Sequence, residues 1–370
     1  MKIVGLSVRR TSSKLATAMS MSTGVVSHAE NLVVRVEGDD GRVGWGEAAA
    51  APSMTGETLD GMFAAARWLS SAVIGGLTAD IASIHQAMDR RMPHNHSVKS
   101  AIDIALHDLL GHETGKPVCD LLGRSRRSRV DLLKLVGSGS LGGDVDAARA
   151  AVAAGYTSLK LKVGIESVVQ DAERTLAVRE AVGSTVLLAA DANGAWSIDQ
   201  AGRYLAGVAE AKLDFLEQPV APEQLRHSAA LFREHGVPIG IDESLSGFDD
   251  LQRAGDEQLA QGGSFKLIKI GGLAQLVDAI ERADRRGFHV NLAGKVAETG
   301  IGTAALLHAA AVAPTLAWGC SPSNAYLHDD IVVPALIARD GAMTVPQGPG
   351  LGITVDEARL ADCTLELAEF

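Results

Sequence analysis

The sequence predicts an α/β protein in which a parallel barrel is combined with a smaller α+β domain. Strand-like runs recur between residues 132 and 319, with helix-like stretches between them. Strand, loop and helix repeated in this order are typical of a parallel α/β barrel. The first 125 residues lack this rhythm. With 370 residues, of which 46% are hydrophobic, the chain is long enough for a barrel core and a second domain.

The expected barrel strands are short apolar runs. They cover residues 132–136, 157–164, 186–190, 213–216, 238–241, 264–270, 289–292 and 316–319, and helices are expected at 167–182, 197–210, 222–235 and 273–286. Charged residues fall at positions 160, 191, 217, 242 and 266, at intervals of roughly 25 to 30 residues. Because the carboxyl ends of barrel strands meet at one mouth, we expect these charges to lie together there.

The N-terminal region predicts an antiparallel sheet followed by helices. Strands are expected at 2–10, 28–37 and 43–48, and helices at 58–71, 80–88 and 98–111, with Thr58 as a candidate N-cap. The polar stretch 11–24 contains Met19 and Met21, and it is either a linker or a lid over the mouth. We favour the lid, with both methionines facing substrate. Residues 52–58 form a second expected capping loop.

Composition and charge limit the classes of partner. The net charge of −11 and the pI near 5.5 disfavour nucleic acid and a membrane surface as partners, and no segment has the length of a spanning helix. The three cysteines lack metal-binding spacing and indicate reduced thiols. No secretory signal is expected before the first strand, and we expect a cytoplasmic protein.

Two lysines stand close together in the expected strand 157–164. Lys160 and Lys162 are two residues apart, so their side chains point to the same side of a strand. Two neighbouring ammonium groups in an apolar strand are costly, and at least one is expected to have a lowered pKa and to serve as a general base. An edge strand with two solvated lysines is the alternative.

Three carboxylates at successive strand ends predict a metal site. Asp191, Glu217 and Asp242 would repel one another at one mouth unless a cation lay between them. Oxygen ligands select Mg²⁺, with Mn²⁺ as a substitute, and the absence of histidine and cysteine at these positions disfavours zinc. Lys162 and Lys266 would face a bound substrate carboxylic acid from opposite sides. This arrangement suits removal of its α-proton and stabilisation of an enediolate.

The motifs Lys-x-Lys, Asp-x-Asn, Glu-Gln-Pro, Asp-Glu-Ser and Lys-x-x-Lys-x-Gly-Gly occur here in one order and spacing. Together they resemble the enolase superfamily, specifically the muconate lactonizing subgroup of the mandelate racemase/muconate lactonizing enzyme family. The resemblance covers nearly the whole chain. It implies a modified TIM barrel, (β/α)7β, at 126–330, an α+β capping domain with lid loops at 1–125, and a C-terminal segment, 331–370, that returns to the capping domain. It also implies a homo-oligomer.

The resemblance also implies residue roles. Lys162 would be the base on one face, Lys160 would orient the substrate carboxylate, and Lys266 would act on the other face. Asp191, Glu217 and Asp242 would bind Mg²⁺. Lys269 lies three residues from Lys266 and is therefore expected to point away from the mouth.

Further residues are expected around this centre. Asn193, Glu243 and Glu298 are candidates for a supporting layer, and Met19, Met21, Cys320 and Ser321 are candidates for substrate contact. Cys320 is a poor candidate nucleophile, because no histidine belongs to the strand-end set.

Several reactions fit the expected centre. We favour a racemase, epimerase or dehydratase acting on an amino-acid-type or proline-type acid; muconate cycloisomerase and dipeptide epimerase are the alternatives. In dipeptide epimerases of this subgroup an Asp-x-Asp after the eighth strand holds the substrate ammonium, but here the segment reads Ser321-Pro322-Ser323-Asn324. A binding protein that kept only the metal is a second class. A dinucleotide-dependent oxidoreductase is disfavoured, because no G-x-G-x-x-G opens a helix after a strand.

Overall fold

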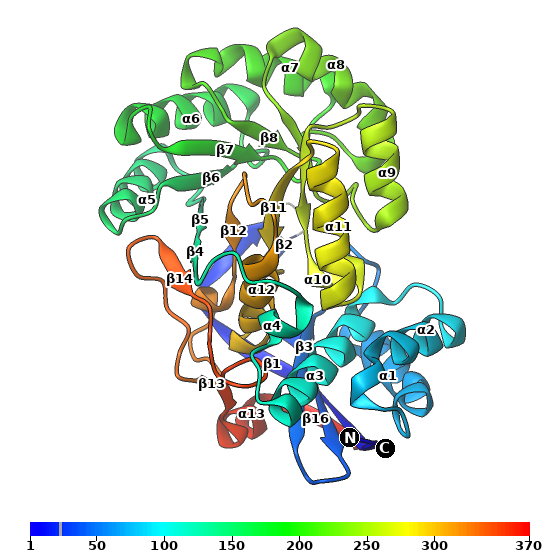
Figure 1. Cartoon of the computed structure of the whole chain (residues 1–370). Helices are drawn as coiled ribbons and strands as arrows, with labels where there is room; N and C mark the ends of the chain where they lie inside the picture. Colours follow the sequence, from blue (N-terminus) through cyan, green and yellow to red (C-terminus); the bar gives the residue numbers. More distant parts are fainter. Residues whose placement is uncertain (22–23) are drawn as a thin grey trace.

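The computed structural model describes residues 1–21 and 24–370, and the side chains of residues 19–25 lie outside this description. An eight-stranded parallel sheet curls into a barrel with helices around it, and an antiparallel sheet with its own helices lies beside the barrel (Figure 1). The expected fold class is confirmed. No helix among the described residues is long and apolar enough to cross a membrane.

The barrel strands follow one another in chain order. They are β5 (Leu133–Val136), β6 (Ser158–Lys162), β7 (Leu187–Asp191), β8 (Phe215–Glu217), β9 (Ile239–Ile241), β10 (Gly262–Phe265), β11 (His289–Ala293) and β12 (Cys320–Ser321). A bridge between Leu132 and Cys320 brings the last strand next to the first. β6 and β10 are therefore four strands apart in either direction around the barrel, which places them on opposite walls.

Helices connect the strands and cover the outside of the barrel. They are α5 (Leu141–Ala153), α6 (Val168–Val182), α7 (Ile198–Gly207), α8 (Leu225–His235), α9 (Phe248–Asp256), α11 (Leu273–Arg285) and α12 (Gly300–Val312). Ser167 and Ser197 begin α6 and α7 with capping boxes, in which each serine accepts from the backbone of a glutamine three residues later. Their sequence signature is local, which explains why these two helix starts were predictable.

The expected strand 264–270 is wrong in its second half. β10 ends at Phe265, and one helical turn, α10 (Leu267–Ile270), follows. Alternation of side chains therefore stops at Lys266. The eighth strand also differs from the expectation, because β12 begins at Cys320 rather than at Leu316.

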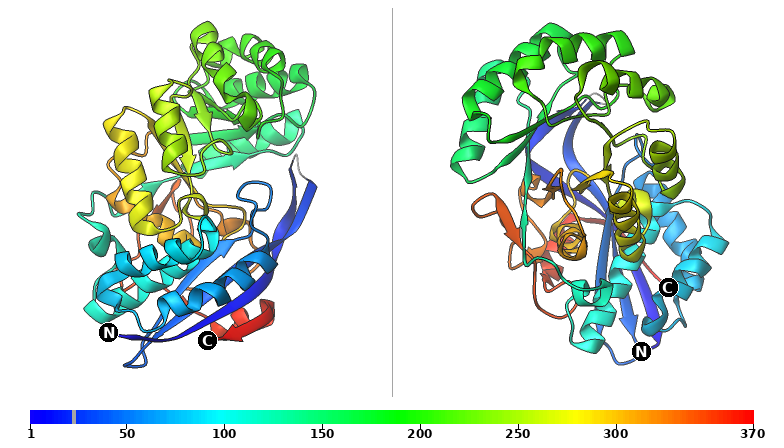
Figure 2. Two further views of the ribbon diagram at one scale, coloured as in Figure 1. Left: turned by 90° about the vertical axis from the view of Figure 1, so that its right-hand side faces the viewer. Right: turned by 45° about the horizontal axis from the view of Figure 1, so that its top comes forward.

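The antiparallel sheet is dominated by one long hairpin. Its order is β16 (Thr364–Glu369), β1 (Ile3–Met21), β2 (Gly24–Gly38) and β3 (Val43–Ala49). The expected loop 11–24 is instead the far end of the β1–β2 hairpin, paired as far as Met21 and Gly24. Figure 2 shows this hairpin reaching toward the barrel.

Four helices and the C-terminal segment complete this part of the molecule. The helices are α1 (Leu59–Val73), α2 (Ile81–Arg91), α3 (His96–Thr114) and α4 (Val118–Leu122). Thr58 caps α1 as expected, accepting from the backbone of Gly61. Helix α3 packs so closely on β3 that a Cβ on Gly46 would collide with the carbonyl oxygen of Ala101. Close approach of backbone to backbone requires glycine there.

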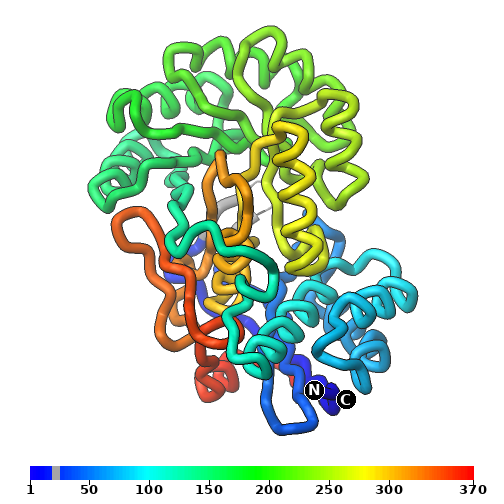
Figure 3. Tube along the Cα trace, viewed as in Figure 1, coloured from blue at the N-terminus to red at the C-terminus, as the bar shows by residue number. Residues whose placement is uncertain are grey.

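The C-terminal segment touches both parts. β14 (Ala342–Thr344) pairs with β4 (Arg129–Asp131), and β13 (Val332–Val333) pairs with β15 (Thr354–Val355). After α13 (Glu357–Cys363), β16 returns to the edge of β1, so the two termini lie side by side (Figure 3). Segment 331–370 was expected to return to the capping domain; its last strand, β16, joins the capping sheet, whereas β14 pairs with β4.

Candidate active site

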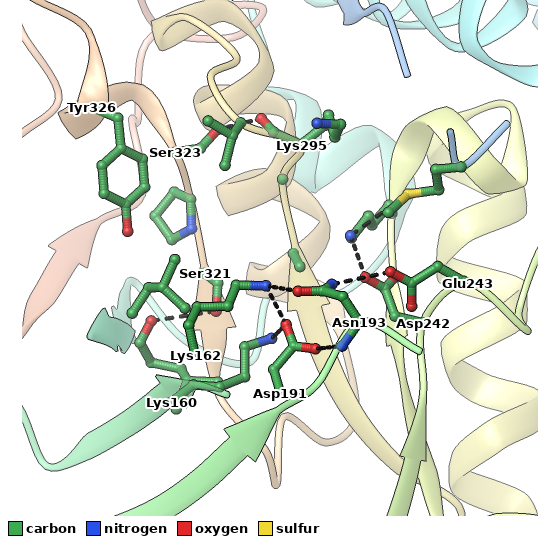
Figure 4. A pocket seen from close by; sticks show the side chains of 18 of the residues that line it. Lys160, Lys162, Asp191, Asn193, Asp242, Glu243, Lys295, Ser321, Ser323 and Tyr326 are labelled. Carbon is green, nitrogen blue, oxygen red and sulfur yellow. Dashed lines mark hydrogen bonds and ion pairs between the residues drawn. The ribbon is translucent and has the colours of Figure 1, made fainter. Parts of the chain in front are cut away.

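The charged residues that the sequence analysis selected end neighbouring barrel strands. In the parallel register, Lys162 lies beside Asp191, Asp191 lies beside Glu217, and Glu217 lies beside Gly240. Asp242 follows β9 directly. The expected convergence at one mouth is therefore present, and a cavity opens there (Figure 4).

Lys160 and Lys162 point to the same side of β6, as expected, and each ammonium group faces a carboxylate. The Nζ of Lys160 lies 2.8 Å from Glu217, and the Nζ of Lys162 lies 2.6 Å from Asp191. Arg174 on α6 donates to the backbone oxygen of Lys162 at 2.9 Å and so holds the end of the strand. The alternative, an edge strand with two solvated lysines, is wrong, because β6 pairs with a strand on each side.

The expected lowering of a lysine pKa on β6 is not seen at Lys160. Burial alone would lower its pKa, but the carboxylates of Glu217 and Asp191 outweigh burial and raise it. Repulsion between the two lysines does not set the pKa of Lys160, because each lysine faces a carboxylate that was expected only to bind the metal.

Lys269 contradicts its expected outward position. Its side chain is fully buried, and its Nζ lies 2.8 Å from the carboxylate of Asp242 and 2.7 Å from the carbonyl oxygens of Asp242 and Ser264. Lys266 binds the other oxygen of the same carboxylate at 2.7 Å. The helical turn α10 brings both lysines to Asp242. Burial, followed by the charge of Lys266, lowers the pKa of Lys269.

The three carboxylates differ in charge environment. Burial opposes ionisation of Asp242, but Lys266 and Lys269 hold its pKa well below the usual range. Asp191 likewise has a lowered pKa, because Lys162 and Lys160 outweigh burial. Glu217 has a raised pKa, because burial and the nearby charges of Asp191 and Asp242 together exceed the effect of Lys160.

The chemistry of this donor set fits a hard divalent cation. Glu217 leaves one buried carboxylate oxygen, Oε1, with no hydrogen-bond partner. Such an orphaned anionic oxygen is costly unless a cation lies against it. Among the described residues, no three acidic, histidine or cysteine side chains form a closed ligand set. The remaining carboxylate oxygens accept from lysines, except for Oδ1 of Asp191, which accepts from the backbone N–H of Asn193 at 3.0 Å. The oxygen-only donors match Mg²⁺ and Mn²⁺.

Asn193 and Glu243 form a hydrogen-bonded link between the end of β6 and the segment that follows β9. Asn193 Oδ1 accepts from Lys162, and its amide donates to Glu243 at 3.0 Å. Burial, followed by the charges of Asp242 and Asp191, raises the pKa of Glu243 to about 7. Figure 4 shows Asn193 between Lys162 and Glu243. Both residues therefore lie next to the strand-end charges, and their supporting role stays a prediction.

Glu298 belongs to the loop between β11 and α12. It is buried, and burial together with the charge of Glu47 raises its pKa to about 8. Glu47, on β3, accepts from the backbone of Thr299 at 2.8 Å and of Gly302 at 3.0 Å. A carboxylate from the antiparallel sheet thus caps the start of α12, next to Glu298. Nothing in the sequence pattern pointed to Glu47.

The two candidate contacts on β12 differ in position. Ser321 lines the cavity, but Cys320 is fully buried in the core, and burial raises the pKa of its thiol to about 12. Adjacent residues of a strand face opposite sides, so the placement of Ser321 excludes Cys320 from the mouth. All three cysteines are unpaired thiols, as expected.

The hairpin and the second capping loop both reach the mouth. Leu15 of the hairpin packs with Ala297 and Leu327, which belong to the loops after β11 and β12. Met54 of the second loop lines the cavity, with its sulfur 3.7 Å from the Nζ of Lys266. The side chains of Met19 and Met21 lie outside the described residues.

Sequence reasoning missed part of the cavity wall. Lys295, Ser323 and Tyr326 line it and come from the loops that follow β11 and β12. The rule that strand ends meet at the mouth could have found Lys295, which lies two residues after β11. Ser323 and Tyr326 gave no comparable signal, because their type and spacing are ordinary for a loop.

Comparison with known protein families agrees with this geometry. Residues 3–123 match the mandelate racemase/muconate lactonizing enzyme N-terminal domain, and residues 144–359 match the enolase C-terminal domain-like family. The chain belongs to the mandelate racemase/muconate lactonizing enzyme family of the enolase superfamily. The chain is therefore an enzyme, and its relatives in this superfamily include a cycloisomerase, an epimerase and a racemase, all of which are isomerases.

Relatives within the mandelate racemase/muconate lactonizing enzyme family carry several activities. A hydrophobic dipeptide epimerase of Enterococcus faecalis is 30% identical over 84% of this chain and 87% of its own length. A chloromuconate cycloisomerase of Cupriavidus necator is 28% identical over 98% of this chain and 99% of its own. The crystal structure of an N-succinyl Arg/Lys racemase from Bacillus cereus superposes with a TM-score of 0.95 at 26% identity, over the full length of both chains.

Proposed function

We propose that this protein moves the α-proton of a carboxylic acid substrate, with Mg²⁺ as cofactor, and that it acts as a racemase or epimerase of amino-acid-type acids. The supporting observation is the placement of Lys162 and Lys266 on opposite walls of the barrel. Racemisation requires an acid and a base on opposite faces of one carbon.

Asp191, Glu217 and Asp242 are the residues that would hold Mg²⁺, whose charge stabilises the negative charge that develops on the substrate carboxylate. Support for this assignment comes from the orphaned oxygen of Glu217. A crystal structure of a dipeptide epimerase from Cytophaga hutchinsonii, 27% identical with a TM-score of 0.93 over the full length of both chains, is described as a complex with Mg and a dipeptide.

The lysines then divide the proton transfer. The neutral amine of one lysine accepts the α-proton, and the electron pair of the broken C–H bond moves into the carboxylate to give an enediolate. The ammonium group of the opposite lysine donates a proton to the other face of the same carbon. Lys160 lies deeper in the barrel and keeps its charge, so it would stabilise the substrate carboxylate without exchanging protons.

Cycloisomerisation of a muconate is the second candidate. It is favoured by the match with chloromuconate cycloisomerases along nearly the whole chain. That reaction needs only one lysine to move a proton. Dehydration of a proline-type acid would likewise need one base.

The test uses exchange of α-protons in deuterated water, followed by mass spectrometry on a panel of carboxylic acids. Lys266→Ala should block exchange from one enantiomer and preserve some from the other, and Lys162→Ala should do the reverse. The loss of a general base typically lowers the rate about 10²- to 10⁴-fold. Lys116→Ala, on the exposed surface, is the control and should leave both exchanges unchanged.

The pattern of loss decides between the candidates. Equal loss from both enantiomers in either variant would contradict two-base racemisation and favour a one-base reaction. Absence of exchange from every acid of the panel, with turnover of a muconate, would replace the racemase proposal with cycloisomerisation.

A further inference from the structure

One lysine of the cavity has no partner in the catalytic arrangement. Lys160, Lys162 and Lys266 each face a carboxylate within 2.8 Å. Lys295 is half-buried in the cavity wall and makes no hydrogen bond or ion pair with the side chains that the structure describes. Lys295 belongs to none of the proposed catalytic, metal-binding or supporting positions.

The position of Lys295 separates it from the proposed metal ligands. It belongs to the loop after β11, and Figure 4 places Lys295 and Ser323 across the cavity from Lys160 and Asp191. Ser323 donates to the backbone oxygen of Lys295 at 2.6 Å, which holds this loop against the segment that follows β12. The ammonium group is therefore carried by an anchored backbone rather than by a free loop.

The surroundings of Lys295 offer hydroxyl groups, and the nearby acidic side chains are either neutral or paired. Ser323 and Tyr326 line the same side of the cavity as Lys295 (Figure 4). Among the acidic side chains that raise the pKa of Lys295, Glu298 has the largest effect and Asp242 the next. Burial raises the pKa of Glu298 to about 8, so it is largely uncharged at neutral pH, and Asp242 is already paired with Lys266 and Lys269. Burial and the charge of Lys266 lower the pKa of Lys295. A cation kept half-buried without a partner costs free energy unless an anion completes it.

From this arrangement we infer that Lys295 binds a second anionic group of the substrate, so that the preferred substrate is a dianion with a carboxylate at each end. This inference rests on the proposed function, because the first carboxylate is the one at the metal ligands. Two sources share the chemistry: an amino acid whose nitrogen carries a dicarboxylic acyl group, and an unsaturated dicarboxylic acid.

The test compares pairs of probes that differ in one carboxylate. The Mg²⁺-loaded enzyme is titrated by calorimetry with N-succinylglycine and N-acetylglycine, and with cis,cis-muconate and its monoacid analogue hexa-2,4-dienoate. For at least one pair, the dianion should bind about 10- to 100-fold more tightly, as expected for a hydrogen bond to a charged group. The pair that shows the difference identifies the source.

Variants of Lys295 assign the difference to its charge. Lys295→Met should remove the preference for the dianion and leave the affinity for the monoanion unchanged, whereas Lys295→Arg should preserve the preference. In turnover, the methionine variant should raise KM for the dianion and alter kcat little, since the interaction is equally present before and during reaction. Circular dichroism of each variant shows that the fold is retained.

The outcomes separate this inference from the proposed function. Equal binding of both members in both pairs overturns the inference, as does an equal loss of affinity for dianion and monoanion in Lys295→Met. Preferential, Lys295-dependent binding with neither α-proton exchange nor turnover would support the second anion site and contradict the proposed function. Exchange of the α-proton without a preference for the dianion would support the proposed function and contradict the second anion site.

Discussion

At the scale of single residues, the site depends on how its buried ammonium groups are paired with carboxylates. Lys266 and Lys269 share Asp242, whereas Lys160 and Lys162 have Glu217 and Asp191. Apart from Lys162, which is partly exposed, these charges are withdrawn from water, so each buried charge depends on its partner. Removing one member should therefore affect both the fold and the chemistry.

The proposed metal site predicts a specific effect of Asp191→Asn. The variant should lose Mg²⁺ affinity and activity together, because each carboxylate offsets part of the charge of the ion. Isothermal titration with Mg²⁺ and a proton-exchange assay provide the two measurements. Asp199→Asn, at the exposed start of α7, should change neither. Full activity after exhaustive chelation would contradict the metal assignment.

Lys269 should behave as a structural residue of the site. Lys269→Met leaves Asp242 with one buried partner fewer, and the loss of one member of a buried ion pair typically costs about 3–5 kcal/mol of unfolding free energy. Urea unfolding without added metal measures this loss, and activity should fall with it. Lys116→Met is the matched exposed control. A variant as stable and active as the wild type would show that the pair with Asp242 is dispensable.

At the scale of elements, the β1–β2 hairpin connects the antiparallel sheet with the mouth of the barrel. Its contact consists of Leu15 against Ala297 and Leu327, and the backbone oxygen of Lys14 accepts from the backbone N–H of His328 at 2.9 Å. The loops it touches also carry Lys295 and Tyr326. We therefore expect the hairpin to hold the cavity closed over a substrate.

Leu15→Ala should weaken this closure. Truncation of a buried leucine leaves a void and reduces packing against the barrel loops. We expect KM to rise severalfold while proton exchange on bound substrate changes little, because a lid contributes equally to binding before and during reaction. Steady-state kinetics measure both quantities. Val4→Ala, on an exposed position of the same strand, is the control. Loss of exchange with KM unchanged would contradict the lid function.

At the scale of the whole molecule, Glu47 links the two parts of the protein. It belongs to β3 and caps α12 of the barrel through Thr299 and Gly302. Burial raises its pKa to about 7 from an ordinary value near 4.5. The native state therefore binds a proton more tightly than the unfolded chain does. The stability contributed by the protonated form is complete below pH 4.5 and is lost as the pH rises through 7.

Glu47→Gln should remove this part of the pH dependence. The free energy of unfolding of the wild type should fall between pH 5 and pH 8 by more than that of the variant, with a difference of up to about 3 kcal/mol. Urea unfolding at both values measures the change. Glu30→Gln, exposed on β2, should keep the wild-type slope. Parallel curves for Glu47→Gln and the wild type would contradict the buried ionisation.

The amino-acid sequence by itself determined the barrel, its strand-end charges and the family. The reason is that parallel strands deliver the residues at their carboxyl ends to one place whatever the details of packing. Asp191, Glu217 and Asp242 could be selected from strand boundaries, and Lys162 from the alternation along its strand. The choice of Lys266 came from the family resemblance, because the expected strand 264–270 ran past it. Asn193 and Glu243 followed from the same rule, because each lies within two residues of such an end.

Tertiary structure alone decided which of these charges pair and what surrounds them. A helical turn after β10 reverses Lys269 toward Asp242, and local sequence does not distinguish this turn from a continued strand. The burial of Cys320, the cap that Glu47 supplies from the other sheet, and the place of Lys295 in the cavity wall all depend on contacts between segments far apart in the chain. Such contacts leave no periodic pattern in the sequence, because neither of the two contacting residues constrains the type of its neighbours along the chain.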